Sequence, residues 1–466
     1  MEPGAPANEL KPVSLPRVGM PRVGIVVLDH HGGDLTRRCV EAIWRTEWPP
    51  EALSVVVVDN NGPAGDLAER LGVPGVTVVD AGRNRGFAGG CNLGIEALGV
   101  VDYVALLNND ATVDPDWLAP LVAVLEADPT VGAACPKIVF DGSFVDVEMH
   151  SPAGPPGGGD QRRLGVAVRG ARLDGIDAWR SVQLVEGFWG VQHDPRTGAA
   201  YQWTNGDAHL RVPARPDGSP GCASLLLSAG EPRSVVVTSG DRRVDHTVGP
   251  EPAWFDVPLG GRPADVINNV GSVLLDGGYG ADRGYLERDD GQYDAVEEVF
   301  AWCGAAVVLS RRYLDAVGTF DESYFLYYED FDLSWRGRAQ GWCYLYVPGP
   351  VVRHVHSASA VEGSRLHHHY TERNRMLTLT RNAPAPMALR AAAHHLLVTA
   401  SYARRDVLQP LLRRQVPSWE TVRRRSVAFA SFTGALPHAL AGRRELRSRR
   451  QVADAELLRW TLDPAR

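Results

Sequence analysis

Long apolar segments are absent from this chain of 466 residues, in which no run of eighteen apolar residues occurs. A helix that crosses a bilayer needs about 20 mainly apolar residues, so no membrane span is expected. The first residues also lack the basic start and apolar stretch of a secretory signal, and we therefore expect a cytoplasmic protein. Residues 1–20 are rich in Pro and small residues and are expected to form a flexible leader.

Cysteine is also scarce. The six cysteines are scattered along the chain, and no two of them have the CxxC spacing of a zinc site. This argues against a zinc knot and a disulfide framework, and it fits a reducing compartment. Aromatic residues make up 8% of the chain and charged residues 22%, which is typical of a globular protein, and the length allows about three domains.

The net charge of −8 is unevenly distributed. Residues 381–466 contain 16 Arg and six Asp or Glu, so this segment carries +10 and the remainder −18. Apolar stretches interleave with the Arg clusters, which predicts Arg-rich helices divided by Pro410, Pro417 and Pro437. Such helices either lie on an anionic membrane surface, at the inner face of the plasma membrane, or pack on the rest of the chain with a solvated basic face. Aromatic residues do not alternate with the Arg clusters, so no nucleic-acid partner is expected.

Residues 21–147 alternate between strands and helices in the manner of a nucleotide-binding α/β sheet. Strands are predicted at 23–28, 54–61, 76–80 and 103–107. Asp59 and Asn60 lie at the end of the second strand, and polar residues 108–110 follow the fourth. Ligands of such sheets bind at the carboxyl ends of the strands, so these polar side chains are candidates for a ligand site.

A glycine-rich stretch, GRNRGFAGGCNLGI, occupies residues 82–95 between the third and fourth of these strands. It predicts a loop ahead of a helix that runs from Asn92 to about Leu98. Glycines at such a place let backbone N–H groups approach a diphosphate closely. Glycine-rich turns are common, so this signal alone does not identify the ligand.

Asp110 follows Asn108 and Asn109 directly after the fourth strand. One interpretation is that this group holds a divalent cation against a phosphate, because hard cations bind oxygen ligands. The alternative is an Asx turn, and Asp114 is expected to cap a helix that begins at Pro115.

Residues 148–262 lose the alternating helices and become rich in Gly and Pro, with short alternating segments that predict an antiparallel β-sandwich. Its aromatic residues either fill the core or stack on sugar rings; they include Trp179, Trp189, Trp203 and Trp254. The α/β pattern resumes over residues 263–380, with a strand within 299–310, helices at 311–317, 332–340 and 370–381, and strands at 343–347 and 350–357.

Side chains that can act as a base or bind a metal also occur in this second α/β segment. Glu329 and Asp330 come just before or in the first turn of a helix, where a carboxylate can cap the helix or act as a general base. His354 and His356 lie at the end of the last predicted strand. Together with Asp110, they indicate a metal site beside a base.

The ordered motifs VVVVDNN, NRGFAGGCNLGI, LLNND, WCGAAVVLSRRYLDAVGTFDESYFLYYEDFDLSWR and HVHS resemble the inverting, metal-dependent glycosyltransferases of family 2. The nearest likeness is to the rhamnosyl- and galactofuranosyltransferases of bacterial cell-wall and surface-polysaccharide synthesis. The resemblance covers about 23–147 and 263–380. It implies an α/β GT-A fold with a Rossmann-like mixed sheet, an inserted antiparallel β-sandwich and a C-terminal helical region.

The same resemblance assigns roles to residues of this chain. Asp330 corresponds to the catalytic base, with Glu329 beside it as an acceptor-binding group. Asp110 fills the last position of the DxD metal motif, and His354, with His356 as the alternative, fills that of a later metal ligand. The nucleotide and donor contacts that it implies are Asp59, Asn60, Arg85, Gly86, Gly89, Gly90, Asn92, Asn108, Asn109 and Trp302.

One departure from the family pattern is Asn108, because many members have Asp at this first DxD position. Its amide still offers an oxygen, but the site loses a charge, so we expect a weaker affinity for Mg²⁺ or Mn²⁺ rather than an inactive enzyme.

The expected function is transfer of a sugar, with inversion, from a nucleotide-diphosphate donor such as dTDP-rhamnose or a UDP-sugar to a glycan or lipid-linked glycan acceptor. An alternative is a non-catalytic carbohydrate-binding or scaffold protein with a degenerate transferase domain. A nucleotidyltransferase is less favoured, because no Lys or Arg follows the first strand in LDHHGGDL.

Overall fold

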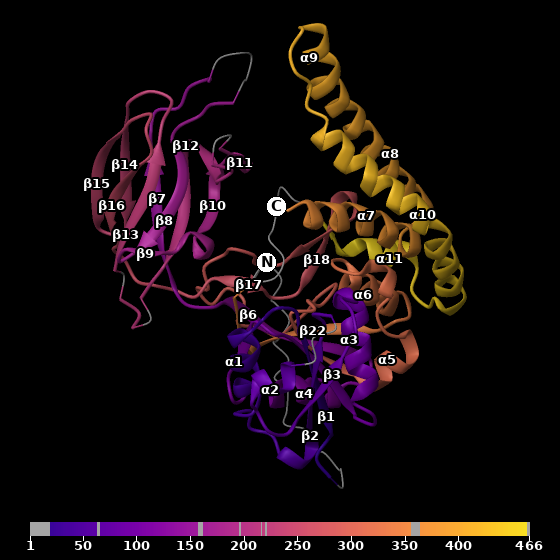
Figure 1. Ribbon diagram of the computed structural model, residues 1–466. Helices are drawn as coiled ribbons and strands as arrows, with labels where there is room; N and C mark the ends of the chain where they lie inside the picture. Colours follow the sequence, from indigo (N-terminus) through magenta and orange to yellow (C-terminus); the bar gives the residue numbers. More distant parts are fainter. Residues whose placement is uncertain are drawn as a thin grey trace, which may run out of the picture.

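The computed structural model describes residues 19–62, 66–156, 162–194, 197–215, 217–219, 221–355 and 364–463. The predicted fold class is confirmed: a mixed α/β sheet, a separate antiparallel sheet and a set of C-terminal helices form three parts of the molecule (Figure 1). The predicted leader falls almost entirely on residues 1–18, which lie outside the described residues.

The mixed sheet has the strand order β20-β22-β6-β21-β4-β1-β2-β3, with β17 paired to β6 and β5 paired to β22. Neighbouring strands β4, β1, β2 and β3 are parallel, β21 runs antiparallel to β4 and β6, and β22 is parallel to β6. The strands are β1 (Val23–Asp29), β2 (Leu53–Asp59), β3 (Val76–Asp80), β4 (Tyr103–Asn108), β5 (Ala111–Val113), β6 (Val131–Phe140), β17 (Ile267–Asn269), β20 (Glu297–Glu298), β21 (Ala306–Ser310) and β22 (Cys343–His354).

Helices pack on both faces of this sheet, because its central strands are apolar on both sides. They are α1 (Asp34–Ile43), α2 (Leu67–Leu71), α3 (Gly86–Ala97), α4 (Leu118–Ala127), α5 (Arg311–Val317) and α6 (Glu329–Ala339), with short 3₁₀ turns at Pro50–Ala52, Asp276–Gly278 and Glu322–Tyr324. The expected cap is wrong, because α4 begins at Leu118 after Trp117 and Asp114 does not cap it.

The second sheet is antiparallel and has the order β15-β14-β7-β12-β8-β13-β16. It curls so that β15 and β16 meet, where His246 Nε2 lies 3.1 Å from the Asp256 carbonyl oxygen, and it encloses its own apolar core. Its strands are β7 (Phe144–His150), β8 (Ala167–Leu173), β9 (Ile176–Asp177), β10 (Gln183–Phe188), β11 (Gln192–His193), β12 (Ala200–Pro213), β13 (Cys222–Ser228), β14 (Arg233–Ser239), β15 (Arg242–Val248) and β16 (Ala253–Pro258), with a 3₁₀ turn at Trp179–Ser181.

The C-terminal part consists of α7 (Arg365–Asn382), α8 (Ala385–Tyr402), a π-helical stretch (Ala403–Leu408), α9 (Gln409–Leu412), α10 (Glu420–Arg449), α11 (Asp454–Leu457) and a 3₁₀ turn (Leu458–Trp460). Pro417 lies between α9 and α10, as predicted. Pro410 lies inside α9, which continues the π-helical stretch, and Pro437 lies inside α10, so neither of these divides a helix. A small sheet joins β18 (Ser272–Leu275), β19 (Tyr279–Asp282) and β23 (Thr461–Leu462). Within the described residues, every helix is too short or too polar to cross a membrane.

Candidate active site

The carboxyl ends of four parallel strands meet at one edge of the mixed sheet. Asp29 of β1 pairs in register with Asp59 of β2, Asp59 pairs with Asp80 of β3, and Leu28 pairs with Asn108 of β4. β22 runs in the same direction as these strands, so His354 at its end reaches the same edge. The sheet topology therefore gathers polar side chains from distant parts of the chain.

Asp29 organises the first part of this edge, and the sequence motifs gave no sign of it. Its carboxylate accepts hydrogen bonds from Thr36 Oγ1, from Asn61 Nδ2 at 2.6 Å and from Asn109 Nδ2 at 3.3 Å. Asn109 is buried and also donates to Thr36 Oγ1 at 2.9 Å. Its amide group thus ties the end of β4 to the end of β1 in this structure.

Asp59 is almost fully buried at the end of β2. Its Oδ1 accepts hydrogen bonds from the backbone N and from Nδ2 of Asn61, at 3.1 and 2.8 Å. Its Oδ2 has no hydrogen-bond partner within the described part of the chain. One acceptor of the expected nucleotide contact is therefore left uncommitted.

The glycine-rich stretch forms the first turns of α3 rather than a loop before it, so the expected start of the helix at Asn92 is wrong. The glycines allow close packing. A Cβ on Gly90 would lie 2.3 Å from Leu28, and one on Gly86, which has φ +69°, would lie 2.2 Å from the Phe325 carbonyl oxygen. Helix α3 begins this early because its backbone can approach both β1 and the segment before α6.

Asn60 shapes the start of α3. Its Oδ1 accepts a hydrogen bond from Arg85 N at 2.8 Å, and its Nδ2 donates to Asn84 Oδ1 and to the Gly86 carbonyl oxygen, both at 3.2 Å. On the next turns, Gly89 faces Arg85 and Glu322. Asn92 binds both backbone groups of Phe320, with Nδ2–O at 2.9 Å and N–Oδ1 at 3.1 Å.

The expected metal ligands Asp110 and His354 lie side by side. His354 Nε2 is 3.1 Å from Asp110 Oδ1 and 3.2 Å from Asn108 Nδ2. On the other side of the ring, Nδ1 is 3.0 Å from Oδ1 of the buried Asn268. An Nδ1–H that donates to Asn268 leaves the lone pair of Nε2 directed at Asp110, which is the tautomer that a metal ligand needs.

These donors fit a hard divalent cation that keeps water and phosphate oxygens as further ligands. No cluster of three or more His, Cys, Asp or Glu suited to a metal occurs among the residues described. The alternative ligand His356 lies outside the described residues.

Asp330 lies in the first turn of α6, and its carboxylate accepts two backbone hydrogen bonds. Gly304 N donates to Oδ2 at 2.9 Å and Phe331 N donates to Oδ1 at 2.7 Å. Gly304 directly precedes Ala305, whose carbonyl oxygen accepts from Asn108 N at 2.9 Å. Asp330 is thus held at the sheet edge that carries Asn108.

Glu329 precedes Asp330, and the two carboxyl groups influence each other. Burial, and then the charge of Asp330, raise the pKa of Glu329 well above its ordinary value, and burial also raises the pKa of Asp330. Glu329 is 5% exposed, and its Oε2 has no hydrogen-bond partner in the described ranges. A neutral Glu329 beside an ionised Asp330 is the arrangement that these shifts favour.

The segment before Glu329 has an unusual backbone. Phe325, Tyr327 and Tyr328 all have positive φ, between 65° and 70°. Asn374 of α7, which is fully buried, holds this segment: its Nδ2 donates to three carbonyl oxygens, those of Tyr324, Leu326 and Tyr327, at 2.8–2.9 Å. Strained backbone of this kind persists only where surrounding contacts fix it.

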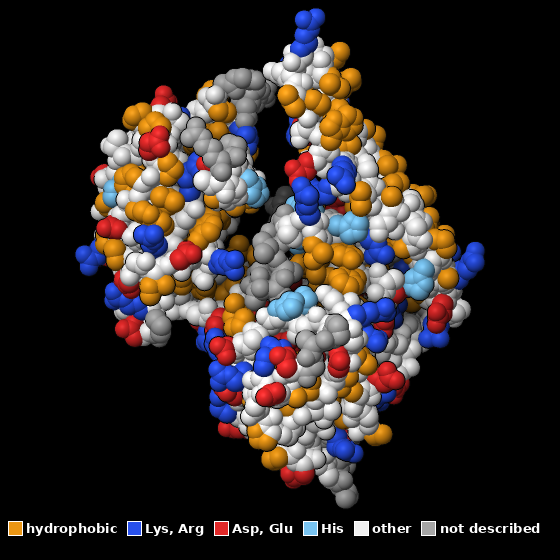
Figure 2. Space-filling view, in the orientation of Figure 1, with side chains coloured by type: hydrophobic (Ala, Val, Ile, Leu, Met, Phe, Trp, Pro, Cys, Tyr) orange, Lys and Arg blue, Asp and Glu red, His pale blue; other side chains and the backbone are white. Residues whose placement is uncertain are grey.

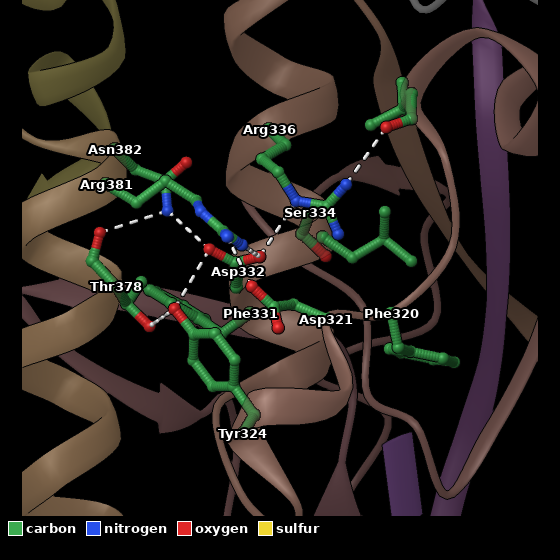
Figure 3. A network of polar contacts seen from close by, with 12 residues as sticks. Phe320, Asp321, Tyr324, Phe331, Asp332, Ser334, Arg336, Thr378, Arg381 and Asn382 are labelled. Carbon is green, nitrogen blue, oxygen red and sulfur yellow. Dashed lines mark hydrogen bonds and ion pairs between the residues drawn. The ribbon is translucent and has the colours of Figure 1, made fainter. Parts of the chain in front are cut away.

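A buried polar network fixes α6 itself to the C-terminal helices (Figure 3). Asp332 is fully buried, and its carboxylate accepts hydrogen bonds from Arg336 Nε at 2.8 Å, Arg381 at 3.1 Å and Asn382 Nδ2 at 2.8 Å. Although burial raises the pKa of this carboxyl group, the two arginines lower it below its ordinary value. Arg381 also pairs with Asp321.

The remaining aromatic candidates are spread over the molecule. Trp302 is fully buried and packs edge-on against Phe320, 6.0 Å between ring centroids. In the second sheet Trp179 packs on the core, whereas Trp254 is 39% exposed and lies under Arg172.

Comparison with known proteins relates the first part of the chain to a family. Residues 25–177 match the sequence profile described as Glycosyl transferase family 2. The chain contains a family 2 glycosyltransferase domain. The matched residues hold β1 to β9, and β17, β20, β21 and β22 from beyond the antiparallel sheet complete the mixed sheet.

Two curated relatives are similar to part of this chain. An "N-acetylglucosaminyl-diphospho-decaprenol L-rhamnosyltransferase" of Mycobacterium tuberculosis is 39% identical over 77 residues, which are 16% of this chain and 25% of the relative. A "Glucosyl-dolichyl phosphate glucuronosyltransferase" of Haloferax volcanii is 27% identical over 226 residues, 47% of this chain and 66% of the relative. The chain therefore spans a quarter of the first relative and about two thirds of the second.

Among solved structures, a crystal structure of "GalNAc-T7 with UDP, GalNAc and Mn2+" has 13% identity and a TM-score of 0.43, over 91% of this chain and 58% of that one. A "Mannosyltransferase PcManGT from Pyrobaculum calidifontis in complex with GDP-Man and Mn2+" has 14% identity and a TM-score of 0.37, over 97% of this chain and 82% of that one.

Several residues that build the site were not found from the sequence. Asp29 lies at the end of β1, and Asn268 lies within the short strand β17; neither belongs to one of the motifs. Asn374 lies in the middle of a helix, and no local pattern distinguishes it from a surface residue.

Proposed function

We propose that this chain transfers a sugar from a nucleotide-diphosphate donor to an acceptor hydroxyl by a single displacement that inverts the anomeric centre. The observation that carries the proposal is the position of Asp330, whose carboxylate is held by two backbone N–H groups at the sheet edge that also carries Asp110 and His354. The family 2 match over residues 25–177 supports it.

In the proposed reaction Asp330 accepts the proton of the attacking hydroxyl. Burial raises its pKa, which makes it a stronger base than an ordinary Asp carboxylate. Both of its oxygens are already oriented by backbone N–H donors, which leaves a lone pair free for the acceptor proton. A single base with no covalent intermediate predicts inversion, because retention needs a second displacement.

The proposed contacts with the nucleotide-sugar donor lie at the ends of the strands. Asp59, with an uncommitted buried oxygen, is assigned to the nucleotide base, and the start of α3 with Arg85 is assigned to the nucleotide. A divalent cation, Mg²⁺ or Mn²⁺, held by Asp110 and His354 would neutralise charge on the departing diphosphate. Asn268 orients His354 for this role.

The proposed donor is dTDP-rhamnose or a UDP-sugar, and the proposed acceptor is a lipid-linked glycan of cell-wall or surface-polysaccharide synthesis. Both curated relatives carry a polyprenol in their names, decaprenol in one and dolichyl phosphate in the other, which supports a lipid-linked acceptor.

A panel of nucleotide sugars, with and without Mn²⁺ or Mg²⁺, tests the donor. A bound ligand raises the unfolding temperature by mass action, so we expect one nucleotide sugar to stabilise the protein more with metal than without, and to be hydrolysed slowly without acceptor. Stabilisation by glycans but by no nucleotide sugar would instead identify a non-catalytic carbohydrate-binding protein.

A further inference from the structure

The C-terminal helices form a hairpin that projects away from the rest of the molecule, with α9 at its tip (Figure 1). Helix α8 leads out, and α10 returns alongside it, where Arg425 Nε lies 3.0 Å from Thr399 Oγ1. The end of the hairpin comprises residues 408–419, from the last residue of the π-helical stretch to the residue before α10.

Large apolar side chains at this tip are exposed rather than packed. Val416 is 93% exposed, Leu412 76% and Trp419 58%, and Leu408 and Leu411 are each half exposed. Such a cluster within twelve residues is uncommon on a globular surface and marks an interaction site. The exposed stripe continues down α8 through Leu389, Leu396 and Leu397.

Unpaired positive charges surround these apolar residues. Arg404, Arg413, Arg414 and Arg423 are exposed, and none of them has an ion-pair partner in the part of the chain that the structure describes. Figure 2 shows basic side chains at the end of the projection and hydrophobic ones along its side.

We propose that residues 404–423, here called the basic tip, dock on the surface of an anionic lipid bilayer. Exposed Leu, Val and Trp side chains bury their apolar parts at the headgroup boundary, while arginines beside them contact lipid phosphates. A convex projection suits a broad, flat partner better than a groove would. Residues 1–380 carry −18 and residues 381–466 carry +10, so an anionic bilayer attracts the C-terminal helices, whose projecting end is the basic tip.

A second copy of the chain is the competing occupant. A symmetric contact between two basic tips would bring like charges together, since a two-fold interface pairs the same patch with itself. An anionic bilayer complements both the charge and the apolar side chains of the basic tip. The bilayer is therefore the favoured partner.

Flotation of the full chain with vesicles tests this inference, and it needs neither donor nor acceptor. The wild type is expected to float with phosphatidylglycerol–phosphatidylcholine vesicles. With vesicles of pure phosphatidylcholine it should remain at the bottom of the gradient. A triple variant, Leu411→Ser with Leu412→Ser and Trp419→Ser, should lose binding. Its matched control, Val100→Ser with Ile176→Ser, removes apolar side chains exposed elsewhere and should bind normally.

A charge variant isolates the electrostatic contribution to vesicle binding. Each arginine near an anionic surface strengthens binding about fivefold, so Arg413→Gln with Arg414→Gln should weaken binding about 25-fold. The control Arg242→Gln with Arg243→Gln, on exposed β15, should leave it unchanged. Added salt should weaken wild-type binding.

Two outcomes would overturn the inference. One is equal binding of wild type and both tip variants to anionic vesicles. The other is no vesicle binding together with a concentration-dependent dimer, seen by sedimentation, that the triple variant abolishes, because the occupant of the basic tip would then be a second copy. Donor stabilisation by nucleotide sugars is measured separately, so failure here leaves the proposed reaction standing.

Discussion

Asn374→Ala is expected to slow the proposed transfer, although Asn374 is fully buried. The side chain lies in α7, and its Nδ2 donates to the carbonyl oxygens of Tyr324, Leu326 and Tyr327. Those carbonyls belong to the segment that leads directly into the first turn of α6 and Asp330. The alanine variant removes all three hydrogen bonds and leaves the segment without its buried support.

The size of the effect follows from the contacts. A neutral hydrogen bond contributes about 1 kcal/mol net, so the three together predict a loss of about 2–3 kcal/mol in the free energy of unfolding. Each residue in a left-handed conformation costs about 1–3 kcal/mol, and Phe325, Tyr327 and Tyr328 are all of this kind. Once unsupported, the segment relaxes, and a displacement of about 1 Å at Asp330 costs about 10²-fold in kcat.

Steady-state kinetics and thermal unfolding check this prediction together. We expect kcat to fall by more than KM for the donor rises, since Asp59 is held by Asn61 and the start of α3 by Asn60 as well as by the Phe325 carbonyl oxygen. Thr380→Val is the matched control, because Thr380 Oγ1 donates only within α7, to the Met376 carbonyl oxygen. Asn374→Asp keeps the shape of the side chain but places a carboxylate against the three carbonyl oxygens. It should therefore lower kcat at least as much as Asn374→Ala. Wild-type kcat in either Asn374 variant would refute the reasoning.

Three further predictions concern the same site. Arg381→Met leaves the buried Asp332 with one arginine fewer, and breaking a buried ion pair costs about 3–5 kcal/mol; a drop in the unfolding temperature, larger at pH 7 than at pH 4, is the expected readout. Glu329 has a folded pKa well above its ordinary value, so its contribution to stability is lost as pH rises above about 4.3. Glu329→Gln should therefore unfold at a higher temperature than wild type at pH 8, with the difference shrinking toward pH 4. Asn268→Leu removes the oxygen that orients His354 and should raise the Mn²⁺ concentration for half-maximal transfer by about 10–100-fold, whereas an unchanged requirement would remove His354 from the metal site.

The sequence predicted the regular elements of the mixed sheet well, because their apolar runs are dictated by burial on both faces. Predictions for β3 and α5 match the structure residue for residue, and β1, β2 and β4 match within one or two residues. The start of α3 was missed because glycine lowers helix propensity, and only the tertiary contacts of Gly86 and Gly90 explain why a helix forms there. Pro437 was expected to break a helix, but α10 continues through it.

Part of the candidate site could be predicted from the sequence. Asp110, Asp330 and His354 were assigned from their motifs. The sheet topology brings the ends of β4 and β22 to one edge, and Gly304 holds the start of α6 beside them. Asp29, Asn268 and Asn374 could not be assigned, because their roles depend on partners between 32 and 86 residues away in the chain. A residue whose only function is to hold distant backbone groups leaves no local pattern.

Turnover of Asp330→Asn, measured beside donor binding, tests the central claim most directly. The amide cannot take the acceptor proton, and general-base catalysis contributes about 10²–10⁴-fold, so transfer should fall by that factor. Thermal stabilisation by the nucleotide sugar should stay at the wild-type level, and the residual product should have the inverted anomeric configuration. Turnover close to wild type in a variant that still binds donor would show that Asp330 is not the base.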